Sequence, residues 1–234
     1  MNLFSYFFLL GSLFHSVILM SGSVYAPWAL VNNPSESALN LAQFANCSIP
    51  DELTDAQDPI VDCLKKVPLT KLMSFTMEVP KYLHLFGPSI DGVTITSDFL
   101  INPESVKKQV QEYKILFGVN SAESLFLFRD HLVNFGFDEE YRDKIFRTYI
   151  RNVYTFHLRE IFAAVVNEYT DWDKPLHHPV NVRDATVNAL SDCQFLAPLL
   201  KFIQLKQLVK ADTFFYVFSH QTKDSSYPPV SSQK

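Results

Sequence analysis

The chain has 234 residues, of which 47% are apolar and 19% are charged, so its composition excludes an intrinsically disordered protein and suits one large domain. Its formal net charge of −5 argues against the basic surface that nucleic acid binding requires, and we expect no nucleic acid among its partners.

The first twenty residues are almost entirely apolar, and three interpretations of them compete. A secretory signal fits the apolar run and the small residues at 21–23, although no positive charge precedes Phe4. A transmembrane helix fits the length but would contain several polar residues. The sequence favours the third interpretation, a buried strand over Ser16–Met20, because SVILM followed by SGS is typical of a core strand that enters a loop.

Short helices are expected next. Ser35 should cap a helix over 36–46, and Pro59 and Pro68 should each begin another. The first helix would turn three apolar side chains inward: Leu39, Ala42 and Phe44. The loop at 86–92, FGPSIDG, contains two glycines and a proline, which predict a tight turn around a buried Ile90.

The stretch ILFGVNSAESLFLF, residues 115–128, predicts a buried strand, a turn and an apolar helix that opens at Glu123. A carboxylate just beyond a buried parallel strand lies where α/β enzymes gather their ligands. The alternative is a carboxylate that is favoured at a helix start by the helix dipole. From the residues alone, both interpretations of Glu123 remain open.

The later part of the chain alternates helices with a strand. Helices are expected over 103–113, from a cap at Asp138, over 155–169, and over 181–200 with a break near Pro198. Residues 213–219 predict a strand, and residues 221–234 form a polar tail without core residues. The apolar stripe of the 155–169 helix is either core or a dimer face. Because strands and helices alternate, the fold class is α/β, with three clear strands.

Motifs for familiar chemistry are missing from the sequence. It contains no G-x-S-x-G elbow, no G-x-G-x-x-G loop and no phosphate loop. None of its seven histidines pairs with another ligand at metal-binding spacing, so we expect neither a metal site nor a cofactor. A nucleophilic set of Cys193, a histidine and Glu123 has no local support, and Cys193 is expected to be a buried thiol.

Cys47 and Cys63 lie sixteen positions apart, which allows either a disulfide or two separate buried thiols. A disulfide would contribute about 3 kcal/mol by restricting the unfolded chain. Asn46 begins the glycosylation sequon Asn46–Cys47–Ser48.

Several segments together resemble type-B carboxylesterases, cholinesterases and neuroligins, over about residues 13–229. They are LFHSVILMSGSVYAPWAL, FGPSIDG, ILFGVNSAESLFLF, EYTDWDKPLHHPVNVRDATVNALSDCQFLAPL and FFYVFSHQTK. The stretch from Arg142 to Trp172 and the end of the chain are most similar to arthropod neuroligins, which are adhesion proteins.

The resemblance implies a partial α/β-hydrolase fold, the C-terminal part of a mostly parallel sheet with flanking helices. Residues 13–220 would form this partial carboxylesterase-like domain, after a divergent apolar segment at 1–12. Glu123 would stand at the acid position of the catalytic triad, and Cys47 and Cys63 would form a family disulfide. The family's nucleophile elbow would lie upstream of Met1 and its histidine loop downstream of Lys234, so His220 is not the triad base.

A catalytically inactive fragment of a neuroligin-like adhesion protein is therefore expected, with Glu123 bonding nearby turn amides. The resemblance implies a cell-surface location without the transmembrane stem. It also implies a neurexin-like partner and a homodimer through the helix that begins near Thr155 and ends at Tyr169. The alternative is a truncated fragment of an active type-B carboxylesterase. A third possibility is a non-functional product whose exposed sheet edges and apolar faces cause aggregation.

Overall fold

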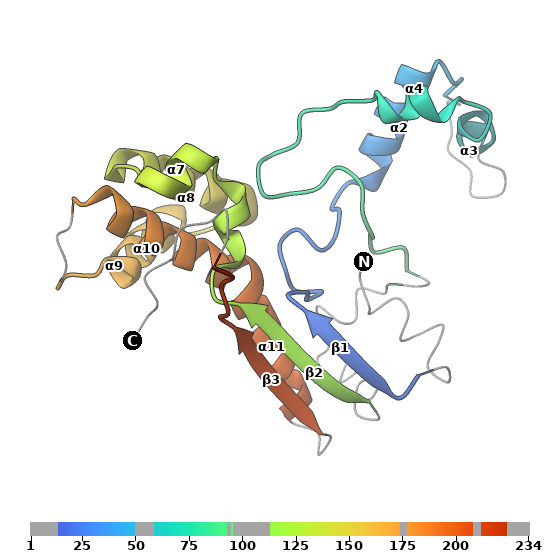
Figure 1. The fold of residues 1–234 in the computed structure, drawn as a ribbon. Coiled ribbons are helices and arrows are strands. Elements are labelled where there is room, and N and C mark those ends of the chain that lie inside the picture. Colours follow the sequence, from blue (N-terminus) through green and yellow to red (C-terminus); the bar gives the residue numbers. More distant parts are fainter. Residues whose placement is uncertain are drawn as a thin grey trace.

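The computed structural model describes residues 14–49, 59–92, 95, 113–173, 177–207 and 212–223 (Figure 1). The expected helix over 103–113 lies outside these residues, as do the apolar segment 1–12 and most of the tail. Among the described residues, no helix is both long enough and apolar enough to cross a bilayer.

A three-stranded sheet in the order β1–β2–β3 forms the centre of the fold. Its strands are β1 (Ser16–Met20), β2 (Lys114–Asn120) and β3 (Thr213–Phe218). Both pairings are parallel, with Ile18 opposite Leu116 and Leu116 opposite Phe214. The α/β class is therefore confirmed, and so is a strand over Ser16–Met20.

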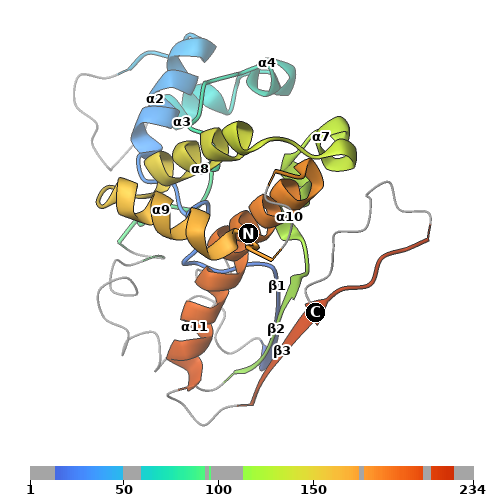
Figure 2. The same ribbon diagram turned by 90° about the vertical axis from the view of Figure 1, so that its left-hand side faces the viewer.

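One face of the sheet packs against helix α11 (Ala197–Gln207), which lies along it in Figure 2. Alternate residues of β2 point to this face, and together with Leu199 and Phe202 of α11 they form the main core cluster. Phe117 is 0% exposed. Its ring meets Phe202 edge to face, with 5.5 Å between centroids. This contact joins the central strand to the helix that covers it.

The opposite face of the sheet is apolar and uncovered by any described helix. Ile18 and Met20 of β1 share it with Phe214 and Phe218 of β3, and all four are exposed. At its centre the Tyr216 ring lies over Gly118, where an added Cβ would come within 1.8 Å of a ring atom. This face of the sheet is therefore one of the exposed apolar faces that a partial sheet was expected to have.

A layer of four helices lies beyond the carboxyl ends of the strands (Figure 1). It contains α7 (Asp130–Phe135), α8 (Glu139–Val153), α9 (Leu158–Tyr169) and α10 (Pro179–Ser191). The apolar stripe of α9 packs on α8 and α10, which favours the core interpretation of that stripe. Helix α9 begins three residues later than expected, at Leu158.

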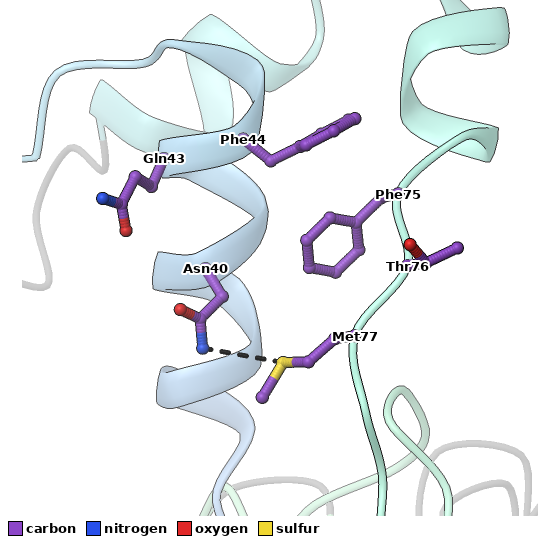
Figure 3. Close-up of a pocket in the computed structure, with 6 residues that line it drawn as sticks. All are labelled: Asn40, Gln43, Phe44, Phe75, Thr76 and Met77. Carbon is purple, nitrogen blue, oxygen red and sulfur yellow. Dashed lines mark hydrogen bonds between the residues drawn. The ribbon is translucent and has the colours of Figure 1, made fainter.

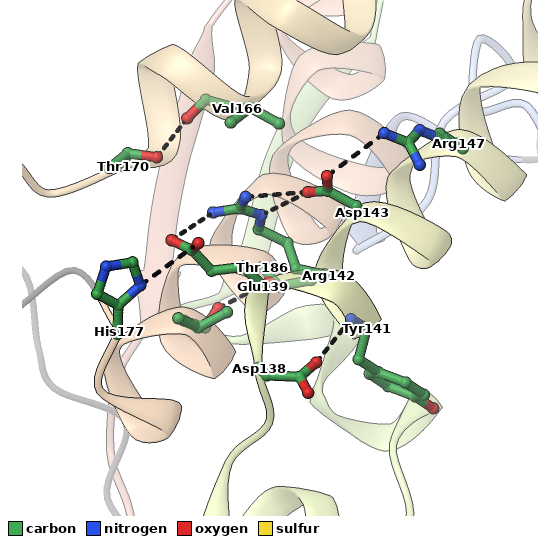
Figure 4. A network of polar contacts seen from close by, with 11 residues as sticks. Asp138, Glu139, Tyr141, Arg142, Asp143, Arg147, Val166, Thr170, His177 and Thr186 are labelled. Atoms are coloured by element: carbon green, nitrogen blue, oxygen red, sulfur yellow. Dashed lines mark hydrogen bonds and ion pairs between the residues drawn. The ribbon is translucent and has the colours of Figure 1, made fainter.

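A polar network also holds this layer together (Figure 4). Asp138 caps α8 as expected, because its Oδ1 accepts from the Tyr141 backbone N–H at 2.8 Å. Arg142 bonds Asp143 at 2.9 Å, and Arg147 bonds the other oxygen of that carboxylate at 3.5 Å. The Arg147 guanidinium also lies 4.8 Å from the centre of the Phe162 ring, which connects α8 to α9.

Helices α10 and α11 form one rod, joined by the π-helical segment η2 (Asp192–Leu196). The expected break near Pro198 is instead a π-helical turn, and the helix continues through it. A proline at 198 has no N–H for the Gln194 carbonyl four residues back. The Trp28 indole N–H donates to this carbonyl instead, at 3.2 Å. Ser23 Oγ donates to the Pro198 carbonyl at 2.8 Å, so the segment after β1 supports the rod at its irregular point.

Three short helices, α2 (Pro34–Ala45), α3 (Pro59–Leu64) and α4 (Leu69–Met73), form a separate group beyond β1 (Figure 1). The Cys47–Cys63 disulfide is present, with 5.9 Å between the Cα atoms. It lies in a small apolar cluster with Ala42, Ala45 and Ile60. The disulfide therefore links the end of α2 to α3 within this small core and restricts the unfolded chain.

Three expectations for this region are wrong. Asn33 rather than Ser35 caps α2, because Pro34 occupies the first helical position. Phe44 faces outward and contacts Phe75 at 5.3 Å between ring centroids, so it lies outside the cluster. Ile90 is 42% exposed, since its loop lies at the surface.

Replacing Phe117 with Ala should lower the free energy of unfolding by about 3–5 kcal/mol, because a fully buried ring leaves a cavity. The matched change Phe214→Ala, one strand away on the uncovered face, should alter it by less than about 0.5 kcal/mol. Urea denaturation of both variants measures the difference. Equal losses would show that the two faces of the sheet are equally buried.

Candidate functional site at the carboxyl edge of the sheet

Glu123 begins the short 3-10 helix η1 (Glu123–Leu127), directly after β2. The predicted apolar helix is therefore a single tight segment. The Asn120 backbone N–H donates to Glu123 Oε1 at 2.7 Å, and Asn120 Nδ2 donates to Oε2 at 3.1 Å. The Ser21 hydroxyl donates to Oε1 as well. The expected bond from Glu123 to a turn amide is thus confirmed.

Ser21 reaches Glu123 because of its place in the sheet. It is the first residue after β1, and its backbone N–H donates to the Gly118 carbonyl of β2 at 2.8 Å. Its φ of 57° lies in the left-handed region, which a serine rarely adopts. The Glu123 carboxylate therefore holds the carboxyl ends of β1 and β2 together.

A buried polar chain connects this edge to the π-helical segment. The Ser124 backbone N–H donates to Ser191 Oγ at 2.9 Å, and Gln194 Nε2 donates to Ser124 Oγ at 3.3 Å. All three side chains are buried. The buried polar groups therefore form hydrogen bonds with one another, as buried polar groups in native proteins generally do.

The sequence did not predict three residues of this network: Ser21, Ser124 and Gln194. Ser21 carried a usable signal, since a polar residue after a parallel strand lies at the same sheet edge as one after the neighbouring strand. Ser124 and Gln194 carried no such sequence signal, because they are 70 residues apart and each lies in an ordinary helical pattern.

No histidine bonds to Glu123, although all seven lie in the described part of the chain. His177 pairs with Glu139 at 3.5 Å, and His157 pairs with Glu160 at 3.8 Å. His84 contacts the Trp28 ring. The structure therefore does not assemble a nucleophilic set of Cys193, a histidine and Glu123. Nor do His, Cys, Asp and Glu side chains among the described residues gather into a group that could hold a metal ion.

Cys193 lies in η2, and its thiol is partly buried. Burial raises the pKa of this thiol to about 11, with a further contribution from the neighbouring Asp192 carboxylate. At neutral pH the group is therefore protonated and a poor nucleophile. The expected buried thiol is therefore only partly buried.

Asn46, the predicted glycosylation residue, follows α2 in the left-handed conformation and is exposed. The next residue is held in the disulfide. A glycan on Asn46 stays a prediction, with a side chain at the surface to carry it.

A second concave site lies between α2 and the extended residues 75–77 (Figure 3). Its volume is about 350 Å³. Neutral residues line it: Asn40, Gln43, Phe44, Phe75, Thr76 and Met77. Asn40 Nδ2 donates to the Met77 sulfur at 3.6 Å, which holds the two walls together. No charged side chain of the described residues lines this cleft, so none of them can pair with an ionic ligand there.

Replacing Glu123 with Ala should lower the free energy of unfolding by about 1–2 kcal/mol, because hydrogen bonds to a charged group are lost. Ser21→Ala should cost less in the Glu123→Ala background than in the wild type. Urea denaturation of the four proteins in this cycle measures the coupling. As a control, Glu78→Ala in the segment after α4 should leave stability unchanged, since that side chain is exposed. Additive losses would mean that Ser21 and Glu123 do not act together.

The sequence of the chain matches a known protein family over most of its length. Residues 5–234 match the model of the carboxylesterase family. Neuroligin-1 of Caenorhabditis elegans is 32% identical over 92% of this chain, and human neuroligin-3 is 28% identical over 92%. Mouse cholinesterase is also 28% identical over 92% of the chain.

The chain spans only part of each of these relatives. It covers 28% of the worm neuroligin-1, 25% of human neuroligin-3 and 36% of mouse cholinesterase. The parallel sheet, the carboxylate at its carboxyl edge and the family match agree with one another. The chain belongs to the carboxylesterase family and is similar to neuroligins within it.

Proposed function

We propose that this chain is part of a cell-surface adhesion protein of the neuroligin type and does not hydrolyse esters. One observation carries the proposal: the chain is 32% identical to neuroligin-1 of Caenorhabditis elegans over 92% of its length, and its Glu123 carboxylate has structural partners in Ser21 and Asn120. A triad acid must orient a histidine base, which in turn activates the nucleophile. The similarity to neuroligins supports the same interpretation.

A neurexin-like protein on another cell is the proposed partner, and the extracellular surface is the proposed location. Both rest on the resemblance to neuroligins. The disulfide supports an oxidising compartment, since such bonds persist in secreted and surface proteins.

The test of this proposal combines an ester assay with a binding assay on the full protein. We expect no turnover of a chromogenic ester above background, and saturable binding to the ectodomain of a neurexin. Glu36→Gln, which changes an exposed carboxylate on α2, serves as the matched control for Glu123→Gln in the ester assay. Turnover that Glu123→Gln abolishes and Glu36→Gln preserves would contradict the proposal.

An esterase is the second candidate function. The similarity to mouse cholinesterase favours it, together with the position of Glu123 at the edge of the sheet where α/β enzymes bind ligands. The coding sequence upstream of Met1 separates the two candidates. A G-E-S-A-G-type elbow there favours an esterase, and a small residue in place of its serine favours adhesion.

We also propose that the protein forms a homodimer through the outer face of α9. The apolar stripe of this helix is used in the core, so the interface would use its other side. Two small residues, Ala163 and Ala164, are exposed there. Phe156, just before the helix, is 76% exposed. Small residues let two helices approach closely, and an exposed aromatic ring can anchor the contact.

Sedimentation velocity tests the dimer. Ala164→Arg should convert the dimer to a monomer, because a long charged side chain separates the helices. Lys144→Glu, an exposed change on α8, is the control and should leave the dimer intact. A dimer that survives Ala164→Arg together with Phe156→Ser would rule out this interface.

A further inference from the structure

A small internal cavity lies where α8, α9 and α10 meet the π-helical segment η2. Its volume is about 20 Å³. Most of its lining is apolar and comes from the three helices. The exceptions are Tyr149 and Tyr154 at the end of α8 and Cys193 in η2. The cavity is therefore a largely apolar space at which three polar side chains meet.

The Tyr149 hydroxyl makes this cavity unusual. Tyr149 is 3% exposed, and its oxygen is the one buried side-chain polar atom of the described residues that has no hydrogen-bond partner. Burial raises the pKa of this phenol, so the group carries its proton and is a donor at neutral pH. A buried donor without an acceptor destabilises a fold, and native structures rarely retain one.

The volume fits one water molecule, because a cavity of roughly 10–15 Å³ is enough to hold one. A water also needs two or more polar partners. Here it can accept from the Tyr149 hydroxyl and donate to the Cys193 sulfur or the Tyr154 oxygen, because all three residues line the same space. Each hydrogen bond has a donor and an acceptor, so no buried group is left unsatisfied.

We propose that this cavity binds a single ordered water that bridges Tyr149 of α8 to Cys193 of η2. The bridge would connect the helical layer to the carboxyl edge of the sheet. Segment η2 also carries Gln194, which donates to Ser124 beside Glu123. The water thereby positions the irregular turn on which the polar chain behind Glu123 depends.

Two measurements on the full protein test the proposal, with Tyr149→Phe as the variant. This change removes the hydroxyl and keeps the ring. A crystal structure of the wild type should show a density peak within hydrogen-bonding distance of Tyr149 Oη, and the variant should lack that peak. The Tm of the variant should fall by a few degrees, because the water loses a partner. Tyr216→Phe, on the uncovered face of the sheet, should leave the Tm unchanged.

A dry cavity gives the opposite results. The wild type would show no peak, and Tyr149→Phe would keep or raise the Tm, because an unsatisfied hydroxyl is removed. Either of these results overturns the proposal.

Discussion

The contact between Phe117 and Phe202 holds the structure together, because it joins the central strand to the rod formed by α10 and α11. The other two described strands, β1 and β3, both pair with β2. The rod runs from the helical layer to the sheet, so the same helix pair positions both. The irregular turn in the rod is supported from outside, by Trp28 and Ser23 of the segment that follows β1.

This arrangement explains the state of Glu123. The parallel register brings Ser21 and Asn120 to the same edge of the sheet, and the carboxylate accepts from both. Because these bonds hold two strand ends together, the Glu123 carboxylate has a structural role that requires no catalytic base. At the sheet edge where α/β enzymes bind ligands, the Glu123 carboxylate here bonds Ser21 after β1 and Asn120 of β2.

The sequence predicted the elements well wherever one local pattern determines them. The strand at Ser16–Met20 and the Asp138 cap are confirmed. The Cys47–Cys63 bond, which the family resemblance implied, is also present. Side-chain burial was harder to predict where it depends on distant contacts. Phe44 of α2 lies against Phe75, which follows α4, and Ile90 lies in a surface loop, so the helical pattern and the loop sequence did not reveal their exposure. Ser124 and Gln194 depend on a contact across 70 residues, which no local pattern encodes.

Hydrogen–deuterium exchange of Glu123→Ala against the wild type tests the central claim, that this carboxylate clamps the carboxyl ends of β1 and β2. Local opening raises exchange only where contacts are lost. The account predicts faster exchange at residues 19–22 and 118–122, and unchanged exchange in α9, which does not touch the clamp. Equal exchange in the two proteins at the ends of both strands would contradict it.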